Sequence, residues 1–452
     1  MRFPHDLSYR FIARAPFYFV VLFSLFLVAC ATPVKKADVE DEYALTPSQD
    51  PFWQSIIRGA DEENFKLLNT GEEASRWRLL MIDSARQSID LESFLWLPDK
   101  AGNQILAHLV AAADRGVRVR ILLDDSFTPH QDLALHHLDL HPNIELRLYN
   151  PYYHRPASLV GRTVLNLGDF SRVNHRMHNK SLVVDGQAVI VGGRNMADEY
   201  FGFHQAHNFR DMEVLAIGKS AVAVSTHFDN FWNSGWSFPV SQVVDASTDE
   251  LGLTAVRDYL AANNLIVDAP DEDQLLAIWQ AAMSDSLKGT AVFFSDQPAR
   301  DDPAADSDQP GQLASFLHEA IAQAETEIIG VTAYFVPTEE LLTALENAVK
   351  RGVRVRVLTN SMRSNNHLAA HAAYLGYVER LLSVGVEIFE TRADARDRHL
   401  YMRSPADEKA LGLHAKFMVI DNDKAVIGSS NLDPRSLKLN TEIGLMIESS
   451  AL

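Results

Sequence analysis

The sequence of 452 residues contains a single cysteine, Cys30, so an internal disulfide is excluded. Any exported form of this fold must therefore be stabilised by burial of its core alone. Basic residues are also few: 41 Lys and Arg against 60 Asp and Glu give a formal net charge of −19. The chain thus lacks the overall positive field that a sequence-independent nucleic-acid-binding protein requires. Long hydrophobic runs are scarce too, since the apolar run from Ala15 to Ala29 is shorter than the roughly 20 residues needed to cross a bilayer.

The N-terminus has the layout of a signal peptide. Arg2, Arg10 and Arg14 precede the apolar run, which is followed at once by Cys30. We expect residues 1–29 to be removed and residues 30–75 to form a tether and N-terminal segment. A plain signal anchor with an incidental buried cysteine is the alternative.

The residues around the expected cleavage point resemble a bacterial lipobox, Leu27-Val28-Ala29-Cys30. The resemblance implies lipidation of Cys30. Ala31 would then be the second mature residue and offers no inner-membrane retention aspartate. We therefore expect a lipoprotein on the periplasmic face of the bacterial envelope, anchored in the outer membrane, which would bring the protein to a membrane surface.

The remainder of the chain contains an internal repeat of two copies. The run Arg115–Arg120 matches Arg351–Arg356 residue for residue, an offset of 236 positions (351 − 115), and His178 and His414 share the same offset (414 − 178). In each copy a strand pattern, a helical pattern ending at glycine and a second strand pattern follow one another. Strands that alternate with helices predict an α/β fold of two duplicated domains with mainly parallel mixed sheets. We expect the domains at residues 76–240 and 312–452, joined by a connecting segment and acidic linker at 241–311.

Each copy contains a motif that suits phosphodiester chemistry. The first runs from His178 through Lys180 to Asp185, and the second from His414 through Lys416 to Asp421. Residues i and i+2 of a strand face the same way, so each histidine projects beside a lysine. Each aspartate lies an odd number of positions from its histidine and should face away, as a structural support.

Two such sets facing each other could act on a phosphodiester. One neutral imidazole can attack phosphorus while the other, protonated, donates to the leaving oxygen. The two lysines, with Asn195 and Asn431 from the following turns, would hold the non-bridging oxygens. No metal or other cofactor is needed, because side chains supply the positive charge.

A nucleophilic histidine needs a partner on its other ring nitrogen. The candidates are Asp211 and Glu442, which lie in the strand predicted after each motif. Whether each carboxylate serves the histidine of its own half stays open at this point.

The two motifs, with the run Gly428-Ser429-Ser430-Asn431 after the second, resemble the signature of the phospholipase D superfamily. The stretch Gly428–Leu445 is most similar to bacterial cardiolipin synthases. The resemblance implies a pseudo-twofold fold with the active site between its halves, a phospho-histidine intermediate, His178 as nucleophile and His414 as general acid. It also implies a phospholipid substrate. The first copy departs from the pattern, with Gly193-Arg194 where the second has Ser429-Ser430, which puts one hydroxyl contact in doubt.

The leading interpretation is a phosphatidyltransferase that makes cardiolipin. The alternatives are a phospholipase D that hydrolyses the same intermediate and a periplasmic phosphodiesterase or nuclease. The acidic composition counts against nucleic acid as a partner. A lipid-anchored scaffold without activity would not need both intact motifs.

The end of the chain lacks a counterpart of one predicted element. After the first copy, residues 221–232 show helical spacing, whereas the second copy stops soon after its last predicted strand. We therefore expect an exposed apolar strip on Ile443, Leu445 and Ile447, in a protein that is shortened or completed by another element.

Overall fold

A computed structural model describes residues 39–57, 62–246, 251–265, 267–298, 311–394, 396, 399 and 410–452. The predicted signal peptide, Cys30 and the acidic stretch at 299–310 lie outside these residues. No helix in the described ranges has both the length and the apolar character needed to cross a membrane.

The first half of the fold follows a short helix, α2 (Pro51–Ile57). Its elements are β1 (Glu63–Leu68), α3 (Gly71–Ser84), β2 (Ser88–Ser93), α4 (Lys100–Asp114), β3 (Arg118–Asp124), α5 (Asp132–Asp139), β4 (Ile144–Tyr149), α6 (Leu159–Leu165), α7 (Phe170–Val173), β5 (Ser181–Val184), β6 (Ala188–Gly192), α8 (Asp198–Phe201), β7 (His207–Arg210), β8 (Glu213–Ile217), α9 (Lys219–Trp232) and β9 (Ser237–Pro239).

A connecting segment leads into the second half. It contains α10 (Val240–Val243), α11 (Leu253–Ala262), α12 (Glu272–Ser284) and β10 (Leu287–Ser295). The second half then comprises α13 (Gln312–Gln323), β11 (Glu327–Val331), α14 (Glu339–Lys350), β12 (Arg354–Asn360), α15 (Leu368–Leu375), α16 (Val378–Ser383), β13 (Glu387–Thr391), β14 (Ala410–Leu413), β15 (Phe417–Ile420), β16 (Lys424–Gly428), α17 (Pro434–Lys438) and β17 (Ile443–Glu448).

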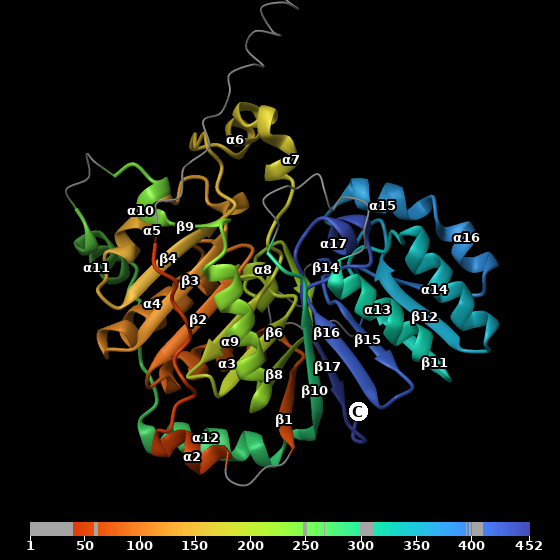
Figure 1. The fold of residues 1–452 in the computed structure, drawn as a ribbon, viewed down its shortest axis with the longest axis horizontal. Helices are drawn as coiled ribbons and strands as arrows, with labels where there is room; N and C mark the ends of the chain where they lie inside the picture. The colour runs from red at the N-terminus through yellow and green to blue at the C-terminus, as the bar shows by residue number, and fades with distance from the viewer. Residues whose placement is uncertain are drawn as a thin grey trace, which may run out of the picture.

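The two halves share one sheet, with β1 and β10 side by side between them (Figure 1). In the described residues its strand order is β13-β12-β11-β15-β16-β17-β10-β1-β8-β6-β5-β2-β3-β4-β9. From the central β10–β1 pair, equivalent strands of the two halves follow one another in the same order towards each edge. Among the described strands of this sheet, only the edge strand β9 has no counterpart. This arrangement confirms the expected mixed α/β, duplicated fold. The shared sheet also includes strands outside the two expected domains, since β1 precedes residue 76 and β10 lies within 241–311.

Fewer strand pairs are parallel than the sequence predicted. Parallel pairing joins β2, β3 and β4 in the first half and β11, β12 and β13 in the second. The strands that follow each motif pair antiparallel, as in β5–β6 and β15–β16. The expectation of mainly parallel sheets was wrong for these strands, because each motif strand returns through a tight turn with no helix between.

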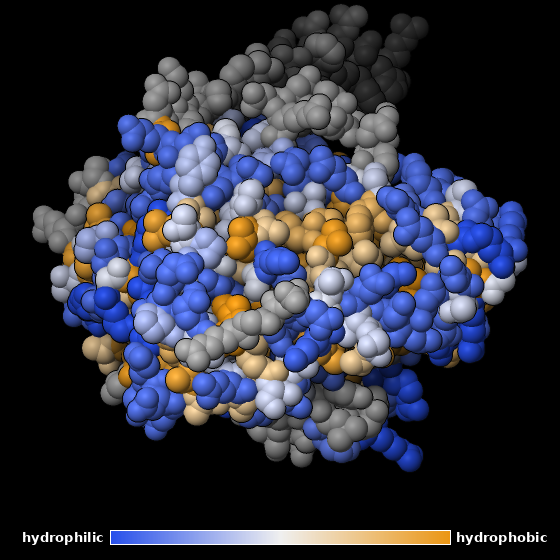
Figure 2. All heavy atoms as spheres, turned by 60° about the horizontal axis from the view of Figure 1, so that its bottom comes forward, coloured by the Kyte–Doolittle hydropathy of each residue, from blue (hydrophilic) through white to orange (hydrophobic). Residues whose placement is uncertain are grey.

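The repeated helices begin and end where the sequence signals indicate. Side chains of Asp99 and Thr338 cap the N-termini of α4 and α14, and Gly116 and Gly352 follow their last turns with φ of 92° and 94°. On the face turned forward in Figure 2, hydrophilic residues cover most of the surface, and hydrophobic residues gather near its middle.

The expected apolar strip at the end of the chain is not exposed. Ile443, Leu445 and Ile447 are fully buried in a cluster with Val183 of β5 and Val214 of β8, among others. That prediction was wrong because the first half packs its own sheet against this face of β17. The seam between the halves is thus a hydrophobic core, and it holds the two motifs against each other.

Candidate active site

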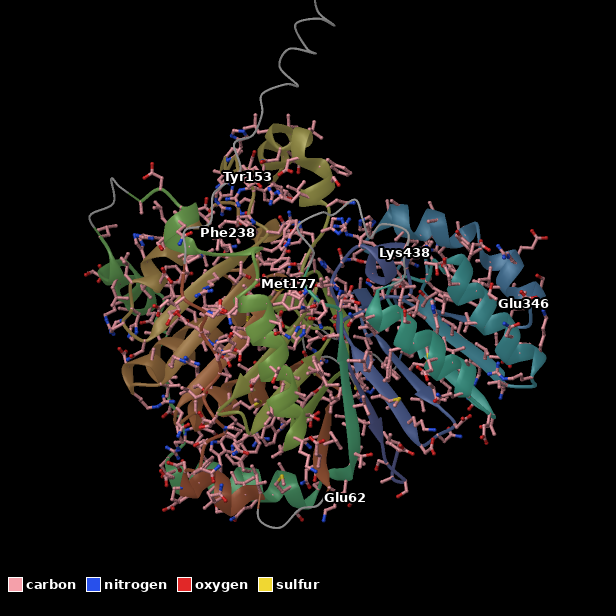
Figure 3. All side chains as sticks on the ribbon, in the orientation of Figure 1. Glu62, Tyr153, Met177, Phe238, Glu346 and Lys438 are labelled. Carbon is pink, nitrogen blue, oxygen red and sulfur yellow. The ribbon has the colours of Figure 1, made fainter. Side chains whose placement is uncertain are left out.

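The two motifs meet where the halves join. Met177, the residue before His178, lies near the centre of the molecule in Figure 3. His178 and Lys180 stand just before β5, and His414 and Lys416 just before β15. All four side chains are buried.

Each lysine folds back beside its own histidine. Lys180 Nζ donates to the His178 carbonyl oxygen at 2.6 Å, and Lys416 Nζ donates to that of His414 at 2.5 Å. Each lysine therefore lies beside its own histidine, as predicted, and in the second half Lys416 Nζ also lies 3.1 Å from His414 Nδ1.

The carboxylate partners are exchanged between the halves. His414 Nδ1 lies 2.7 Å from Asp211 Oδ2, and His178 Nδ1 lies 2.9 Å from Glu442 Oε2. Each histidine therefore takes its carboxylate from the opposite half. This leaves the Nε2 atom of each ring for chemistry.

Backbone pairing between the halves produces this exchange. The His414 amide donates to the Arg210 carbonyl at 2.8 Å, and the His178 amide donates to the Thr441 carbonyl at 2.9 Å. Arg210 and Thr441 directly precede Asp211 and Glu442 in the sequence. In addition, β7 and β14 form a small parallel sheet that joins the two halves beside His414. The exchange is thus fixed by main chain as well as by side chains.

The two buried carboxylates differ in charge state. Burial works to raise the pKa of Asp211, but His414, Lys416 and Arg194 outweigh it and hold that pKa below its usual value. Burial raises the pKa of Glu442 to about 7, against the pull of Lys180. At neutral pH Asp211 is therefore an anion, whereas Glu442 is close to half protonated.

The neighbours of the carboxylates explain part of this difference. The buried Arg194 guanidinium donates to the Asp211 carbonyl at 2.6 Å. Glu442 instead has an acidic neighbour, since its amide donates to Asp296 Oδ2 at 3.0 Å. Burial raises the pKa of Asp296 to about 6. A fixed cation thus lies beside one dyad and a second carboxyl group beside the other.

The basic groups of the site are strongly desolvated. Burial, with the nearby lysines, lowers the pKa of His178 well below its usual value, and burial together with Lys416 lowers that of His414 to about 3. Burial also lowers the pKa of Lys180 to about 7 and that of Lys416 to about 8. Both imidazoles are therefore neutral at neutral pH. The two lysines, whose basicity is reduced, are the groups of the site that can bind an anion.

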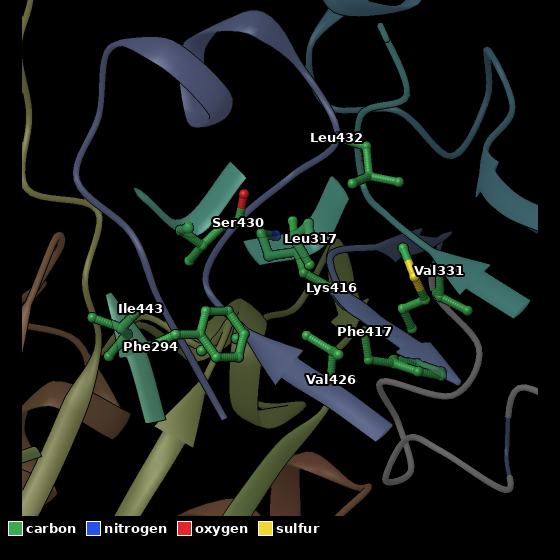
Figure 4. Close-up of a pocket in the computed structure, with 13 residues that line it drawn as sticks. Phe294, Leu317, Val331, Lys416, Phe417, Val426, Ser430, Leu432 and Ile443 are labelled. Carbon is green, nitrogen blue, oxygen red and sulfur yellow. The ribbon is translucent and has the colours of Figure 1, made fainter. Parts of the chain in front are cut away.

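Apolar packing accounts for the desolvation of Lys416. A cavity of about 30 Å³ lies beside it, lined mainly by apolar side chains that include Phe294, Leu317 and Val331 (Figure 4). This space can hold one water-sized molecule, so it is not a substrate pocket.

The aspartates that end the motifs have another task. Asp185 accepts hydrogen bonds from the Trp53 indole and from the amides of Arg86, Gln87 and Ser88. Asp421 accepts from the corresponding amides of residues 325–327 at the start of β11. These carboxylates fasten the motif hairpins to the neighbouring strands and contact neither histidine in the described residues.

The two asparagines are both buried, and Asn195 is linked to His414 through Tyr200. Asn195 Nδ2 donates to the Tyr200 hydroxyl at 2.9 Å, and the Tyr200 ring packs edge-on against His414 at 5.0 Å. The side-chain oxygens of Asn195 and Asn431 are buried, and within the described ranges neither has a hydrogen-bond partner. Buried amides with unused capacity suit the binding of a polar group.

The first copy has Gly193 where the second has Ser429, and this difference has a steric reason. A Cβ atom on Gly193 would lie 2.6 Å from Asp211 Oδ1. At the matching position Ser429 Oγ donates to Glu442 Oε2 at 2.5 Å. The Glu442 carboxylate is therefore supported by the Ser429 hydroxyl. Asp211 instead fits because Gly193 has no side chain, and its carbonyl accepts a hydrogen bond from Arg194.

A further pair of supporting residues escaped the sequence analysis. Asp124 Oδ2 accepts from the Met177 amide at 2.9 Å, and Asn360 Oδ1 accepts from the Leu413 amide at 2.9 Å. Each thus holds the residue before a motif histidine. Their positions differ by 236 (360 − 124), so the repeat offset that relates the motifs could have found them.

Comparisons with known proteins agree with this geometry. The family described as "Cardiolipin synthase, PLD-like domain" matches residues 79–235 and 317–452. Cardiolipin synthase C of Escherichia coli (strain K12) is 37% identical over 84% of this chain and 80% of its own length. Cardiolipin synthase B of Shigella flexneri is 28% identical over 84% of this chain and 76% of its own.

A solved structure shares the fold. It is that of phosphatidylserine synthase from Haemophilus influenzae Rd KW20, with a TM-score of 0.57, 13% sequence identity and coverage of 88% of this chain and 87% of that one.

Proposed function

Because this chain belongs to the cardiolipin synthase, phospholipase D-like family, we propose that it is a phosphatidyltransferase that makes cardiolipin. It would take a phosphatidyl group from one phospholipid and give it to a hydroxyl group of another lipid. The observation that carries the proposal is the pair of exchanged dyads, His178–Glu442 and His414–Asp211, between two buried lysines.

The first step would form a covalent intermediate. His178 Nε2 attacks phosphorus while Glu442 holds its Nδ1, and a nitrogen–phosphorus bond forms. The bond from phosphorus to the headgroup oxygen breaks, and His414 Nε2 gives its proton to that oxygen, which leaves as an alcohol. Lys180 and Lys416 hold the non-bridging oxygens, where charge develops.

The second step would reverse the first with a different alcohol. The hydroxyl of the acceptor lipid gives its proton to His414 Nε2, and its oxygen attacks phosphorus. The nitrogen–phosphorus bond breaks and His178 is restored. No metal or other cofactor enters either step.

The charge difference between the dyads supports these roles. An anionic Asp211 stabilises a protonated His414, as a general acid requires. Glu442, whose pKa is raised to about 7, favours a neutral His178, as a nucleophile requires. In the free site burial and Lys416 lower the pKa of His414 to about 3, so the negative charge of the bound phosphodiester would have to raise that pKa for His414 to carry the proton that it donates.

Hydrolysis is the second candidate, because water could replace the acceptor hydroxyl. The test is incubation of the full-length protein with a phospholipid donor, with and without a lipid that carries a free hydroxyl group, followed by mass spectrometry. Cardiolipin formed only with the acceptor supports transfer. Phosphatidic acid as the main product in both arms would make the protein a hydrolase, and no product in either would overturn both.

We also propose that the protein works at the bacterial envelope as a periplasmic-facing lipoprotein. The sole cysteine placed directly after an apolar run supports this. Mass spectrometry of the protein purified from membranes tests it, since an unmodified Cys30 in the mature chain would refute lipidation.

A further inference from the structure

Helix α6 buries its charged side chain and exposes its apolar ones. Its only charged side chain, Arg162, is fully buried, whereas its neighbour Val160 is 74% exposed. Six large apolar side chains of this helix and the turns after it are exposed: Leu159, Val160, Val164, Leu165, Leu167 and Phe170. A surface helix ordinarily shows its polar face to water, so this arrangement indicates an apolar environment outside.

The reversed orientation is fixed by ion pairs beneath the helix. Arg162 bonds to Asp125 and Asp132, and Arg155 bonds to the same two carboxylates. Asp125 directly follows Asp124, which holds the amide of Met177. The helix is therefore built onto the residues that position His178, and its apolar face cannot turn inward without breaking buried ion pairs.

A second apolar surface lies on the other half. Met362 is 64% exposed and Leu368, the first residue of α15, is 71% exposed, with Leu375 exposed at the far end of that helix. This segment is tied to the site through Asn360, which bonds to Leu413, the residue before His414. Figure 1 shows α6, α7 and α15 at the same end of the molecule.

Both surfaces carry few charges: Arg363 lies at the edge of one, and Asp169 and Arg172, which pair with each other, lie at the edge of the other. Residues 364–376 contain no Asp, Glu, Lys or Arg, in a chain of which 22% of residues are charged, and in 156–167 the buried Arg162 is the single charged residue. A protein with a net charge of −19 approaches an anionic bilayer most readily through a face that has few carboxylates.

We propose that the exposed side chains of α6, α7 and α15, the docking face, insert into a phospholipid bilayer and bring the paired histidines to its surface. The inference rests on the proposed function for its substrate, but insertion itself does not require turnover. Lipid headgroups would then reach the site without leaving the membrane, because Asp125 beneath α6 adjoins Asp124, which holds Met177, and the segment that leads into α15 starts at Asn360, which holds Leu413.

The first test follows insertion directly. In full-length Cys30→Ser protein, Val160→Cys or Leu368→Cys supplies a single thiol for an environment-sensitive dye. Vesicles of phosphatidylethanolamine and phosphatidylglycerol that contain spin-labelled lipid should quench the dye at both positions. The control is Val222→Cys on α9, a valine that is 43% exposed and lies outside the docking face. Equal quenching at Val222, or none at Val160 and Leu368, would overturn the proposal.

The second test follows function. Val160→Ser combined with Val164→Ser should lower transfer from vesicle lipids about tenfold or more, because apolar area contributes to interfacial binding. Activity towards a short-chain, monomeric phospholipid should be unchanged, as should both activities of Val222→Ser. Equal losses with both substrates would mean a distorted site and would overturn the docking role.

The two tests separate the proposals. Quenching without any transfer would refute the phosphatidyltransferase and leave the docking face in place. Transfer without quenching would refute the docking face and leave the phosphatidyltransferase in place. A dye that is shielded before vesicles are added, in a protein that sediments as a dimer, would assign this face to a second copy of the chain.

Discussion

Asp211 holds His414 across the seam between the two halves, at 2.7 Å and 203 residues apart in the sequence. Glu442 holds His178 in the same way from the other side, at 2.9 Å. Each half therefore supplies one histidine and the carboxylate for the other histidine. The catalytic proposal can be tested dyad by dyad for this reason.

Asp211→Asn should lower kcat on the order of 100-fold or more, because an amide no longer stabilises a protonated His414. Glu442→Gln should cost less, since Glu442, with its pKa raised to about 7, is already partly neutral at rest. Steady-state rates of both variants at neutral pH measure this difference. A larger loss in Glu442→Gln would reverse the assigned roles of the two histidines.

His178→Ala and His414→Ala should both lose turnover with natural phospholipids but differ in covalent trapping. A donor with a nitrophenol leaving group needs little acid catalysis, so His414→Ala should still form the phospho-histidine. Intact-protein mass spectrometry after rapid quenching should show the added phosphatidyl mass in His414→Ala only. The mass on His178→Ala instead would identify His414 as the nucleophile.

Binding of a phosphodiester should weaken as the pH rises above about 7 to 8. Burial lowers the pKa of Lys180 to about 7 and that of Lys416 to about 8, so the free enzyme loses both cations over this range. A bound anion favours the charged lysines, and rising pH therefore opposes binding. Titration calorimetry with a non-hydrolysable phosphonate lipid across this range measures the effect. An affinity that stays constant to pH 9 would contradict it.

Activity should survive a chelator. The charge on the transferring group is offset by Lys180 and Lys416, so treatment with EDTA should change the rate by less than about twofold, whereas loss of a catalytic metal costs several kcal/mol. Activity that disappears with EDTA and returns with one particular metal would replace the two-histidine mechanism by a metal-dependent one.

Asp185→Ala should destabilise the fold by about 3 kcal/mol or more, because several buried donors lose their acceptor together. Asp421→Ala removes an equivalent but more exposed acceptor and should cost about 1 kcal/mol. Urea denaturation of the two variants gives the comparison within one chain. Folded Asp185→Ala should keep most of its activity, and an inactive but stable variant would show that the aspartate acts in catalysis.

The sequence predicted the parts of the site better than their pairing. One offset of 236 positions identified both motifs, and the i, i+2 rule placed each lysine beside its histidine. The exchange of Asp211 and Glu442 could not be predicted, because it depends on main-chain contacts between halves that local periodicity does not encode. The loops before these carboxylates also differ in length between the copies, so the shared offset does not extend to them.

The errors in the fold have the same origin. Helices between strands indicated parallel sheets, but the turn at Asp185, with φ of 56°, sends the chain straight back beside itself. The apolar strip on Ile443, Leu445 and Ile447 was predicted to be exposed because the sequence offers no helix to cover it, and that prediction was wrong. Its cover is the sheet of the other half, which only the folded arrangement reveals.

Exchange of the carboxylates also constrains how the two copies can diverge. After a duplication, one copy is ordinarily free to accumulate substitutions while the other keeps the activity. Here a lost Asp211 would disable the histidine of the second copy, and a lost Glu442 that of the first. Under the proposed mechanism neither copy can lose its carboxylate without loss of activity, so substitutions in the two copies are constrained together.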